Sequence, residues 1–545
     1  MNKQKLELTW MGKNKDPEVE ERILIEDKEK SYGDDSSENM LIHGDNLIAL
    51  KSLEEKFSNR IKCIYIDPPY NTGSAFEHYD DNLEHSTWLN LMYRRIKILY
   101  KLLSDDGVLM IHLDDTEVHY LKVILDDIFQ RDNFITTIAV RSSTPSGVKT
   151  THKDKTIIKQ KDWILVYRKS DKLRIVPQYT KKYEWDTHYT YFLDRENKKT
   201  VGLIDKLLEE NIIDKKIKLS DLDVEDKKFK EFYIKNKDNI FRTAPTMPED
   251  IKKKSLLEKD TLIEYFDKNG ELNYAINGNR CTFLSKQIHK LDDGKESLST
   301  LLCDIWTDID FQNTQNEGNN SFPGGKKPEK LIMRILNMFT QEGDFVLDSF
   351  LGSGTTCAVA HKMNRKWIGV EIGDQAYTHC IPRLNSIING TDKSGITEVA
   401  NWNKGGGYKF YDLAPSLLKK DIFNNWVISP EYNSKLLIRA ICKAENYSYI
   451  EDDIYWKNGK SSENNYLYVT TNFVSMELLN IINEELKESE SLLICCKSYQ
   501  EECLKAFEKI NIRKIPLSLL NKCEYGKADY NLNILNVEEV EEDDE

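Results

Sequence analysis

The first third of the chain alternates short apolar runs with segments of helical period. Runs rich in β-branched residues predict strands, and apolar positions three to four residues apart predict amphipathic helices between them. The predicted strands are Met40–His43, Ile61–Ile66, Val108–Leu113, Phe134–Val140 and Trp163–Tyr167. The helix that begins near Ser86 should turn Arg94, Arg95 and Lys97 to solvent. Strands alternating with helices predict βαβ units, and therefore an α/β fold with a doubly wound, mainly parallel sheet.

This alternation stops between about Ser170 and Thr300. The interrupted stretch is rich in Lys, Asp and Asn with isolated aromatic residues, which predicts an inserted domain. After it come a predicted helix (Glu329–Thr340), a strand (Phe345–Leu347), a helix (Thr355–Met363) and a strand (Lys366–Val370). The expected domains are an irregular lead-in over 1–38, two halves of one α/β domain over 39–170 and 301–395, the insert over 171–300, a small C-terminal α/β domain over 396–537 and an acidic tail over 538–545.

The strand Ile61–Ile66 is followed directly by Asp67, Pro68, Pro69 and Tyr70. Two prolines cannot continue a strand or a helix interior, so the strand ends and a stiff loop begins. Ligands of open α/β sheets bind at the carboxyl ends of strands, which is where this carboxylate, carbonyl and aromatic ring would lie. The four residues alone fit a plain Pro-Pro turn, with a capping Asp and a packed Tyr, equally well.

A second predicted strand ends at Asp348 and opens the glycine loop FLGSGTT. Gly352 and Gly354 let the backbone turn tightly, and a helix beginning at Thr355 presents free N–H groups to a phosphate or a carboxylate. Glu371 ends the next strand, where dinucleotide folds bind ribose hydroxyls. A tight turn with a surface Glu is the alternative. No Gly-Lys-Ser/Thr follows the glycines, which argues against a P-loop NTPase.

The two motifs together carry a family resemblance. DPPY at Asp67–Tyr70, followed far downstream by FLGSGTT at Phe350–Thr356, resembles the amino-group DNA methyltransferases that use S-adenosylmethionine, in the motif order of their β class. Longer segments resemble the modification subunit of type III restriction–modification systems: YIDPPYNTG (65–73), HSTWL (85–89), DDGVLMIHLDD (105–115) and GGGYKFYDLAPSLL (405–418). The resemblance covers roughly residues 40–170 and 300–420. It implies an S-adenosylmethionine-dependent methyltransferase fold with a permuted motif order.

The resemblance implies methyl transfer to the exocyclic amine of a flipped base. An adenine N6 amine is a poor nucleophile, because its lone pair is delocalised into the ring. Asp67 and the carbonyl of Pro68 would accept hydrogen bonds from its two N–H groups. Pro69 would stiffen the loop, and Tyr70 would stack on the base. Asp at the first position favours adenine N6, since cytosine-N4 enzymes more often have Ser there. No His is required, and we expect no metal.

By the same resemblance, S-adenosyl-L-methionine would lie along the strand ends as the cofactor. Its methionine end would contact Asp348, Phe350, Gly352, Gly354 and Thr355. Glu371 would bind the ribose, while Asp45 and Asn46 would lie near the adenine. Lys327 resembles part of the segment that closes the methionine end, although the GGK before it departs from the family spelling. For Asp45, a plain helix cap is the alternative.

Charge is unevenly distributed along the chain. The net charge of −14, from 77 basic and 91 acidic residues, disfavours nucleic acid when taken alone, but binding depends on local patches. Residues 141–183 contain twelve Lys or Arg against three Asp. We therefore predict DNA contacts at Asn71, Arg141, Lys149, Lys153 and Lys155, with a solvated basic face as the alternative. In the family, sequence reading falls to the region between the two halves, here 171–300.

The remaining expectations concern location and partners. The ten cysteines include no CxxC pair, which fits a reducing cytoplasm and argues against a zinc site or a disulfide framework. No apolar run is long enough to span a bilayer, and residues 1–22 lack the apolar core of a signal peptide. We expect a cytoplasmic protein. The resemblance implies double-stranded DNA, a helicase–nuclease restriction subunit and a homodimer as partners, and we assign subunit contacts to the C-terminal domain.

Two functions from different classes remain open on the sequence. The first is an enzyme that methylates adenine N6 in a short recognition sequence. The second is a recognition and assembly subunit, whose main role is to bring a helicase–nuclease partner to DNA. A methylase without a partner, or one that modifies cytosine N4, also remains open.

Overall fold

The computed structural model describes residues 7–13, 19–71, 85–144, 153–195, 199–258, 261–268, 270–312, 314–319, 322, 325–520, 523 and 525. The chain forms two compact units, one of Met1–Ile175 with Asp304–Glu545 and one of Val176–Cys303. The second unit lies close in sequence to the stretch where the strand–helix alternation stops.

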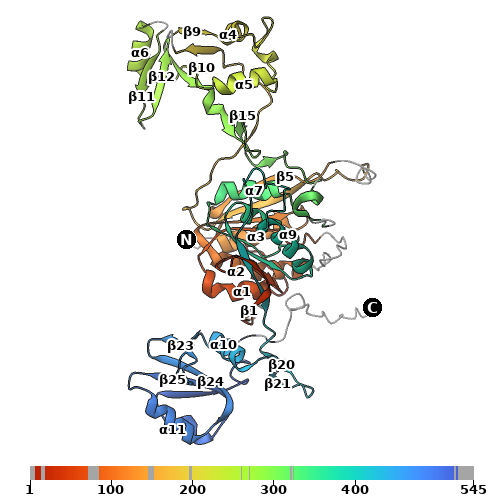
Figure 1. The fold of residues 1–545 in the computed structure, drawn as a ribbon, viewed down its shortest axis with the longest axis vertical. Coiled ribbons are helices and arrows are strands. Elements are labelled where there is room, and N and C mark those ends of the chain that lie inside the picture. Colours follow the sequence, from red (N-terminus) through yellow and green to blue (C-terminus); the bar gives the residue numbers. More distant parts are fainter. Residues whose placement is uncertain are drawn as a thin grey trace, which may run out of the picture. The chain divides into compact units, whose positions relative to one another are not determined.

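The first unit is built on a ten-stranded sheet (Figure 1). In spatial order its strands are β1 (Leu24–Gly33), β19 (Gly407–Leu413), β2 (Met40–His43), β18 (Lys366–Glu371), β17 (Phe345–Asp348), β3 (Ile61–Ile66), β4 (Leu103–Leu113), β6 (Lys161–Arg168), β5 (Phe134–Arg141) and β16 (Ile305–Trp306). The strands from β19 to β4 all run parallel, whereas β1 and β6 are antiparallel to their neighbours. The predicted mainly parallel α/β sheet is therefore confirmed.

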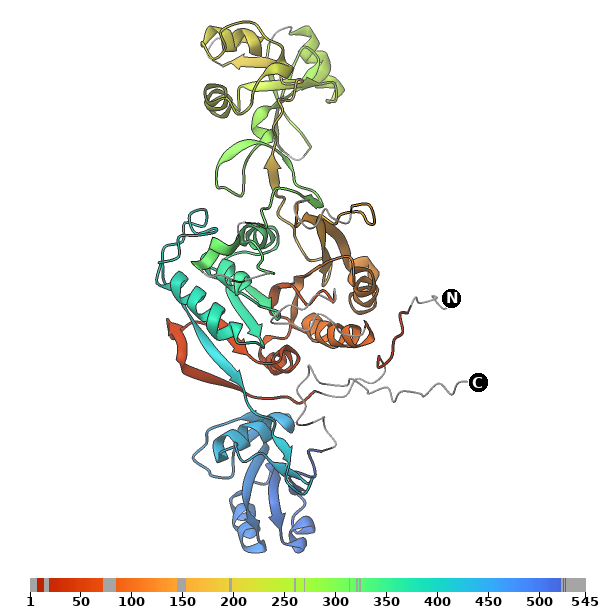
Figure 2. The ribbon, with the colours of Figure 1, turned by 90° about the vertical axis from the view of Figure 1, so that its right-hand side faces the viewer.

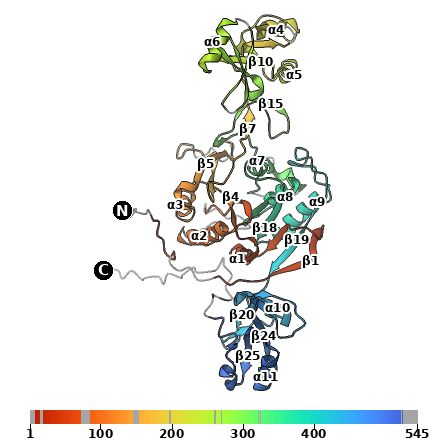
Figure 3. The ribbon, with the colours of Figure 1, turned by 90° about the vertical axis from the view of Figure 1, so that its left-hand side faces the viewer.

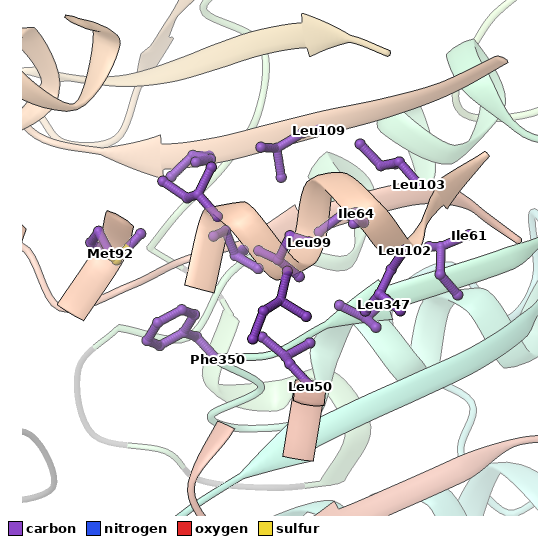
Figure 4. Close-up of a cluster of buried hydrophobic side chains, with 14 of the residues drawn as sticks. Leu50, Ile61, Ile64, Met92, Leu99, Leu102, Leu103, Leu109, Leu347 and Phe350 are labelled. Carbon is purple, nitrogen blue, oxygen red and sulfur yellow. The ribbon is translucent and has the colours of Figure 1, made fainter. Parts of the chain in front are cut away.

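Helices cover both faces of this sheet (Figure 3). They are α1 (Asn46–Phe57), α2 (His85–Leu102) and α3 (Val118–Phe129) on one face, and α7 (Glu329–Phe339), α8 (Thr355–Lys362) and α9 (Ile381–Ile388) on the other. Alternate residues of the central strands pack beneath α1 and α2 in one apolar core, where Leu50, Leu99, Ile64 and Leu347 meet Phe350 (Figure 4). Burial of this period-2 face explains why short β-branched runs form these strands.

The order of the strands creates a switch point at the centre of the sheet. From β3 the chain winds outward through α2 to β4, and from β17 it winds in the opposite direction through α8 to β18. β3 and β17 are adjacent and parallel, with Ile64 beside Leu347. Open α/β sheets bind ligands outside the carboxyl ends of strands at such a point.

The expected irregular lead-in over 1–38 is wrong in part, because Leu24–Gly33 forms β1 at the edge of the sheet. β1 pairs antiparallel with β19, bringing Leu24 beside Leu413. Its sequence LIEDKEKSYG is charged, as edge strands often are, since charge discourages further pairing. Because its partner lies near the other end of the chain, no local pattern could indicate this strand.

The second unit has its own layers. A six-stranded sheet has the order β11 (Ile263–Phe266), β12 (Leu272–Ile276), β13 (Asn279–Phe283), β10 (Ile240–Ala244), β8 (Tyr191–Asp194) and β9 (Lys199–Gly202). A three-stranded sheet joins β14 (Ile288–Lys290), β15 (Glu296–Leu301) and β7 (Tyr179–Lys181). The helices are α4 (Leu203–Glu209), α5 (Lys227–Lys235) and α6 (Glu249–Leu257). Trp185, Tyr189, Phe229 and Tyr233 form the centre of an aromatic core.

The C-terminal region forms a five-stranded sheet with two helices, drawn in blue in Figure 2. Its strands are β22 (Ser448–Tyr449), β23 (Gly459–Ser462), β24 (Asn465–Val474), β25 (Ser491–Tyr499) and β26 (Ile510–Lys514), and its helices are α10 (Ser434–Ala444) and α11 (Met476–Glu485). A hairpin of β20 (Leu418–Lys420) and β21 (Trp426–Ile428) precedes it. Within the described ranges, no helix has the length and apolar character that crossing a membrane requires.

Candidate active site at the strand ends

Four acidic side chains lie at the carboxyl ends of four consecutive parallel strands. In spatial order Asp45 follows β2, Glu371 ends β18, Asp348 ends β17 and Asp67 follows β3. The backbone links the ends of the first two strands directly, since Gly44 N, next to Asp45, donates to the carbonyl of Glu371 at 2.9 Å. The sequence predicted each of these residues, and the sheet order brings them to one edge. In the described part of the chain, no three His, Cys, Asp or Glu side chains are grouped to hold a metal ion.

The Asp67 loop is held by contacts on both sides of its two prolines. The Tyr70 hydroxyl donates to Asp67 Oδ1 at 2.9 Å, and Trp88 Nε1 donates to the carbonyl of Pro69 at 2.8 Å. The carbonyl of Pro68 is therefore fixed between two anchored residues. Burial and the charge of Asp67 raise the pKa of Tyr70 well above its usual value, so the hydroxyl stays protonated and remains a donor. Asn71, which follows Tyr70, has a left-handed φ of 59°.

A buried histidine supports the Tyr70 ring and was not predicted. His112, in β4, lies nearly parallel to that ring, with 6.3 Å between centroids and 26° between planes. Its Nδ1 lies 2.9 Å from the Tyr65 hydroxyl, and its Nε2 lies 3.6 Å from Asp162. Although burial raises the pKa of Asp162, its nearness to His112 lowers it below its usual range. His112 was hidden in the sequence because its strand reads as a continuous apolar run.

The glycine loop is shaped by its two neighbouring carboxylates. Asp348 Oδ1 accepts from Phe350 N at 3.0 Å, and Asp348 Oδ2 accepts from the Thr356 hydroxyl at 2.5 Å. Glu371 Oε2 accepts from Gly352 N at 2.6 Å. Gly354, the N-cap of α8, has a φ of +81°, and a Cβ there would lie 3.3 Å from Cys380 Sγ. The left-handed backbone therefore favours glycine, and a Cβ would fit only tightly against Cys380.

The carboxyl group of Asp348 has a strongly raised pKa. Burial, followed by the negative charges of Asp67 and Glu371, raises its pKa to about 7. The side chain is only 2 % exposed. A buried carboxylate among other acids favours a cationic ligand, because a positive charge would offset both the burial and the repulsion.

The Asp45 end of the site contains a correction to the sequence analysis. Arg95 is fully buried rather than turned to solvent, and its guanidinium lies 3.5 Å from Asp45 Oδ2. Its Nε donates to Asn46 Oδ1, and Asn46 Nδ2 donates to the carbonyl of Ser349 at 2.6 Å. Asp45 also caps α1, accepting from Leu47 N at 2.8 Å. The helix-cap alternative is thus correct for one oxygen, while the other faces a buried cation.

Glu329, Lys362 and Arg383 form a buried ionic cluster. Thr355 is hydrogen-bonded to this cluster, and Lys327 lies next to it in the sequence. Arg383 donates to the Thr355 hydroxyl at 2.8 Å and to Glu329 at 2.7 Å. Lys362 also donates to Glu329, at 2.8 Å. The side chains of Glu329, Lys362 and Arg383 are all buried. Lys327 precedes this cluster by two residues, and its ammonium contacts the Asp67 carboxylate. The structure therefore brings a residue predicted for the cofactor to the DPPY loop.

The basic stretch 141–183 is less free than its composition suggests. Lys159, Lys161 and Lys172 form ion pairs with Asp114, Asp115 and Asp105 respectively. By contrast Arg141, Lys153 and Lys155 are exposed, and Arg141 lines a cavity of about 180 Å³ with residues 307–312. Asn71 Nδ2 donates to the buried Glu117 at 2.8 Å. Lys149 lies outside the described residues.

The sheet order and the strand-end acids define an open α/β protein with a ligand site at a topological switch point. A family model described as DNA methylase, labelled for N6 and N4 methyltransferases, matches residues 61–381. Since this is more than half of the chain, the protein belongs to the DNA methylase family.

Individual relatives and solved structures also match the chain. The chain is 35% identical over 411 residues to the HindVI Mod subunit of Haemophilus influenzae, named as a probable type III restriction-modification enzyme, covering 70% of this chain and 54% of that protein. It is 25% identical over 535 residues to the type III EcoP15I Mod subunit of Escherichia coli, covering 80% of this chain and 77% of the relative. A solved PvuII DNA methyltransferase, cytosine-N4-specific, matches with 14% identity and a TM-score of 0.33, over 67% of this chain and 91% of its own. The match to the HindVI Mod subunit spans about half the length of that protein.

Proposed function

We propose that this protein is a site-specific DNA methyltransferase that moves a methyl group from S-adenosyl-L-methionine to the N6 amine of a flipped adenine. The observation that carries the proposal is the meeting of the DPPY loop with the glycine loop at one switch point. Asp67 and Asp348 follow adjacent parallel strands, so an amine acceptor and a cofactor loop share one edge of the sheet.

The Asp67 loop has the chemistry that an exocyclic amine needs. Asp67 and the carbonyl of Pro68 provide two acceptors whose separation is fixed by the flanking prolines and by the bond from Trp88. Tyr70 provides a ring face for the flipped base, and His112 keeps that ring in place. Positioning and a preorganised polar site would supply most of the rate enhancement, and the amine proton can leave after the methyl group arrives.

The residues around the glycine loop fit S-adenosylmethionine. When bound, this cofactor supplies an electrophilic methyl group on a sulfonium. Asp348, buried with a raised pKa, would gain a cationic partner from the methionine ammonium or the sulfonium. Glu371 at the end of β18 would accept from ribose hydroxyls, and Asp45 with Asn46 would border the adenine.

Two observations favour the second unit, 176–303, as the part that reads DNA. It contains 24 Lys or Arg and 24 Asp or Glu, so the whole net charge of −14 belongs to the rest of the chain. A groove of about 510 Å³ on this unit is lined by five lysines against three acids. Lys227, Lys235 and Lys295 are exposed there, and no described carboxylate lies within 4.0 Å of them. Free lysines along a groove suit phosphates.

We further propose that the protein is the modification and recognition subunit of a type III restriction–modification system in the cytoplasm. The Mod subunits named above support this assignment. It implies a helicase–nuclease partner, and a homodimer whose contacts come from the C-terminal region. Co-purification with the product of a neighbouring restriction gene tests the partner, and light scattering tests the dimer.

Methyl transfer itself is tested with purified protein, S-adenosylmethionine labelled in its methyl group, and genomic DNA that lacks modification. We expect label in N6-methyladenine after digestion of the DNA. Label in N4-methylcytosine would overturn the base assignment alone, whereas cofactor binding without label in DNA would favour a recognition subunit.

A further inference from the structure

Both oxygens of the Asp67 carboxylate have donors in the structure. Oδ1 accepts from the Tyr70 hydroxyl at 2.9 Å, and Oδ2 accepts from the ammonium of Lys327. The same ammonium lies 5.4 Å from the centroid of the Tyr70 ring, in the range of a cation–π contact. Lys327 therefore touches the two groups that, on the proposed function, receive the target base.

The position of Lys327 is fixed by rigid surroundings. The lysine is followed by Pro328 and then by Glu329, the first residue of α7. Glu329 is fully buried and is bonded by Lys362, by Arg383 and by the backbone N–H of Ile396. Because this ion cluster holds the start of α7, the Lys327 backbone is held too. Its side chain is only 12 % exposed.

An unpaired Asp67 would be costly in this place. Asp348 ends the adjacent strand, and its pKa is raised first by burial and then also by the negative charges of Asp67 and Glu371. A cation on Oδ2 relieves that repulsion while no DNA is bound. The Tyr70 hydroxyl bonds an acid three residues away in the same stiff loop, so of the two donors it is the one less able to leave.

We infer that Lys327 is a placeholder for the target base, with its ammonium N–H occupying the acceptor that the substrate amine will use. This inference rests on the proposed function. Entry of the base then requires Lys327 to leave Asp67 Oδ2. The substrate amine would replace the ammonium as the N–H donor to Asp67, and the base would replace it as the partner of the Tyr70 ring. Lys327 is thus a positioning residue of the DPPY loop and not a ligand of the methionine end.

The exchange is tested with Lys327→Met, which keeps the length of the side chain but removes the competing donor. The substrate is a duplex carrying the recognition sequence identified by modification sequencing, with either adenine or purine at the target position. Purine lacks the 6-amino group. Lys330→Met, one turn along α7, is the matched control, because Lys330 pairs with Asp308 rather than with Asp67.

We expect Lys327→Met to lower KM for adenine DNA by about threefold or more, with the dissociation constant for S-adenosylmethionine unchanged. The ratio of the dissociation constant for the purine duplex to that for the adenine duplex should rise in the variant, because the adenine amine meets a vacant acceptor. Lys327→Arg, which keeps a donor, should not show this gain. Matched melting temperatures would show that the variants are folded.

Three results would overturn the inference. One is a raised cofactor dissociation constant, which would return Lys327 to the methionine end. The others are an unchanged KM for adenine DNA and an unchanged ratio of the dissociation constants for the purine and adenine duplexes. Failure of the proposed function is a separate result, since the unaltered protein would then not methylate DNA, whether or not it binds S-adenosylmethionine.

Discussion

Asp348 ends strand β17, and Asp67 directly follows the adjacent parallel strand β3. Burial, together with the charge of Asp67, raises the pKa of Asp348 to about 7. This relationship connects the two halves of the site. It makes the glycine loop sensitive to the charge of the DPPY loop, and it yields a pH dependence that can be measured.

Binding of S-adenosylmethionine should strengthen as pH rises. A cationic ligand favours the ionised form of Asp348, which is protonated in the free protein below about pH 7. The dissociation constant should fall by up to about tenfold per pH unit below pH 7 and level off above it. Calorimetry in two buffers of different ionisation enthalpy would detect the released proton. A pH-independent affinity would contradict this assignment.

Replacing Asp348 should separate stability from binding. The pKa of Asp348 is raised in the folded protein, so the stability contributed by its proton is lost as pH rises from about 4 to about 7. At pH 8 without cofactor, Asp348→Asn should melt at a higher temperature than the unaltered protein, yet gain nothing from S-adenosylmethionine. Asp374→Asn, at an exposed position, is the control and should resemble the unaltered protein. A lower melting temperature for Asp348→Asn at pH 8 would count against the electrostatic account.

Arg95→Met should destabilise the fold strongly. The change leaves Asp45 Oδ2 and Asn46 without their buried cation, and removing one partner of a buried pair costs about 3 kcal/mol. Urea unfolding gives the free energy difference. Lys97→Met, on the part-exposed face of the same helix, should change it by less than about 0.5 kcal/mol. Equal effects of the two variants would show that Arg95 packs as an apolar stem only.

Arg141, Lys153 and Lys155, exposed cations of the stretch 141–183, should contact DNA phosphates. The triple variant Arg141→Ala, Lys153→Ala, Lys155→Ala should weaken DNA binding and reduce the salt dependence by about two to three counterions. Lys161→Ala with Lys172→Ala is the control, because both lysines are already neutralised by Asp115 and Asp105. If the control loses as much affinity as the triple variant, the ion pairs do not decide which cations meet DNA.

The lysine groove of the second unit should also bind phosphates. Lys227→Ala, Lys235→Ala and Lys295→Ala together should lower affinity for all duplexes to a similar extent and again flatten the salt dependence. Lys286→Ala, elsewhere on the unit, serves as the control. Full affinity in the triple variant would remove the groove from the DNA path.

The parts of this structure that sequence could predict are those with local signals. The ends of β3, β17 and β18 were predictable because apolar runs stop at Asp67, Asp348 and Glu371, next to prolines or glycines. The parallel sheet then follows from alternating strands and helices. Family resemblance supplied the roles of these residues, which spacing alone left open.

The remainder depends on partners that lie far away in the sequence. Arg95 reads as a polar position of an amphipathic helix, and only the fold brings Asp45 to it. The charge excess over 141–183 overlooked Asp105, Asp114 and Asp115, which neutralise three of its lysines. Long-range pairing of this kind leaves no period or motif in the chain, so it is found only from coordinates.

The most direct test of the central claim is sequencing that detects base modification in DNA from cells that express this protein, beside cells that express its Asp67→Ala variant. The account predicts N6-methyladenine at one recurring short motif with the unaltered protein. It predicts no mark with the variant, because the amine loses its acceptor while Tyr70 and the cofactor loop remain. A mark that persists in Asp67→Ala, or no mark from either protein, would contradict the claim that the DPPY loop is the site of methyl transfer to DNA.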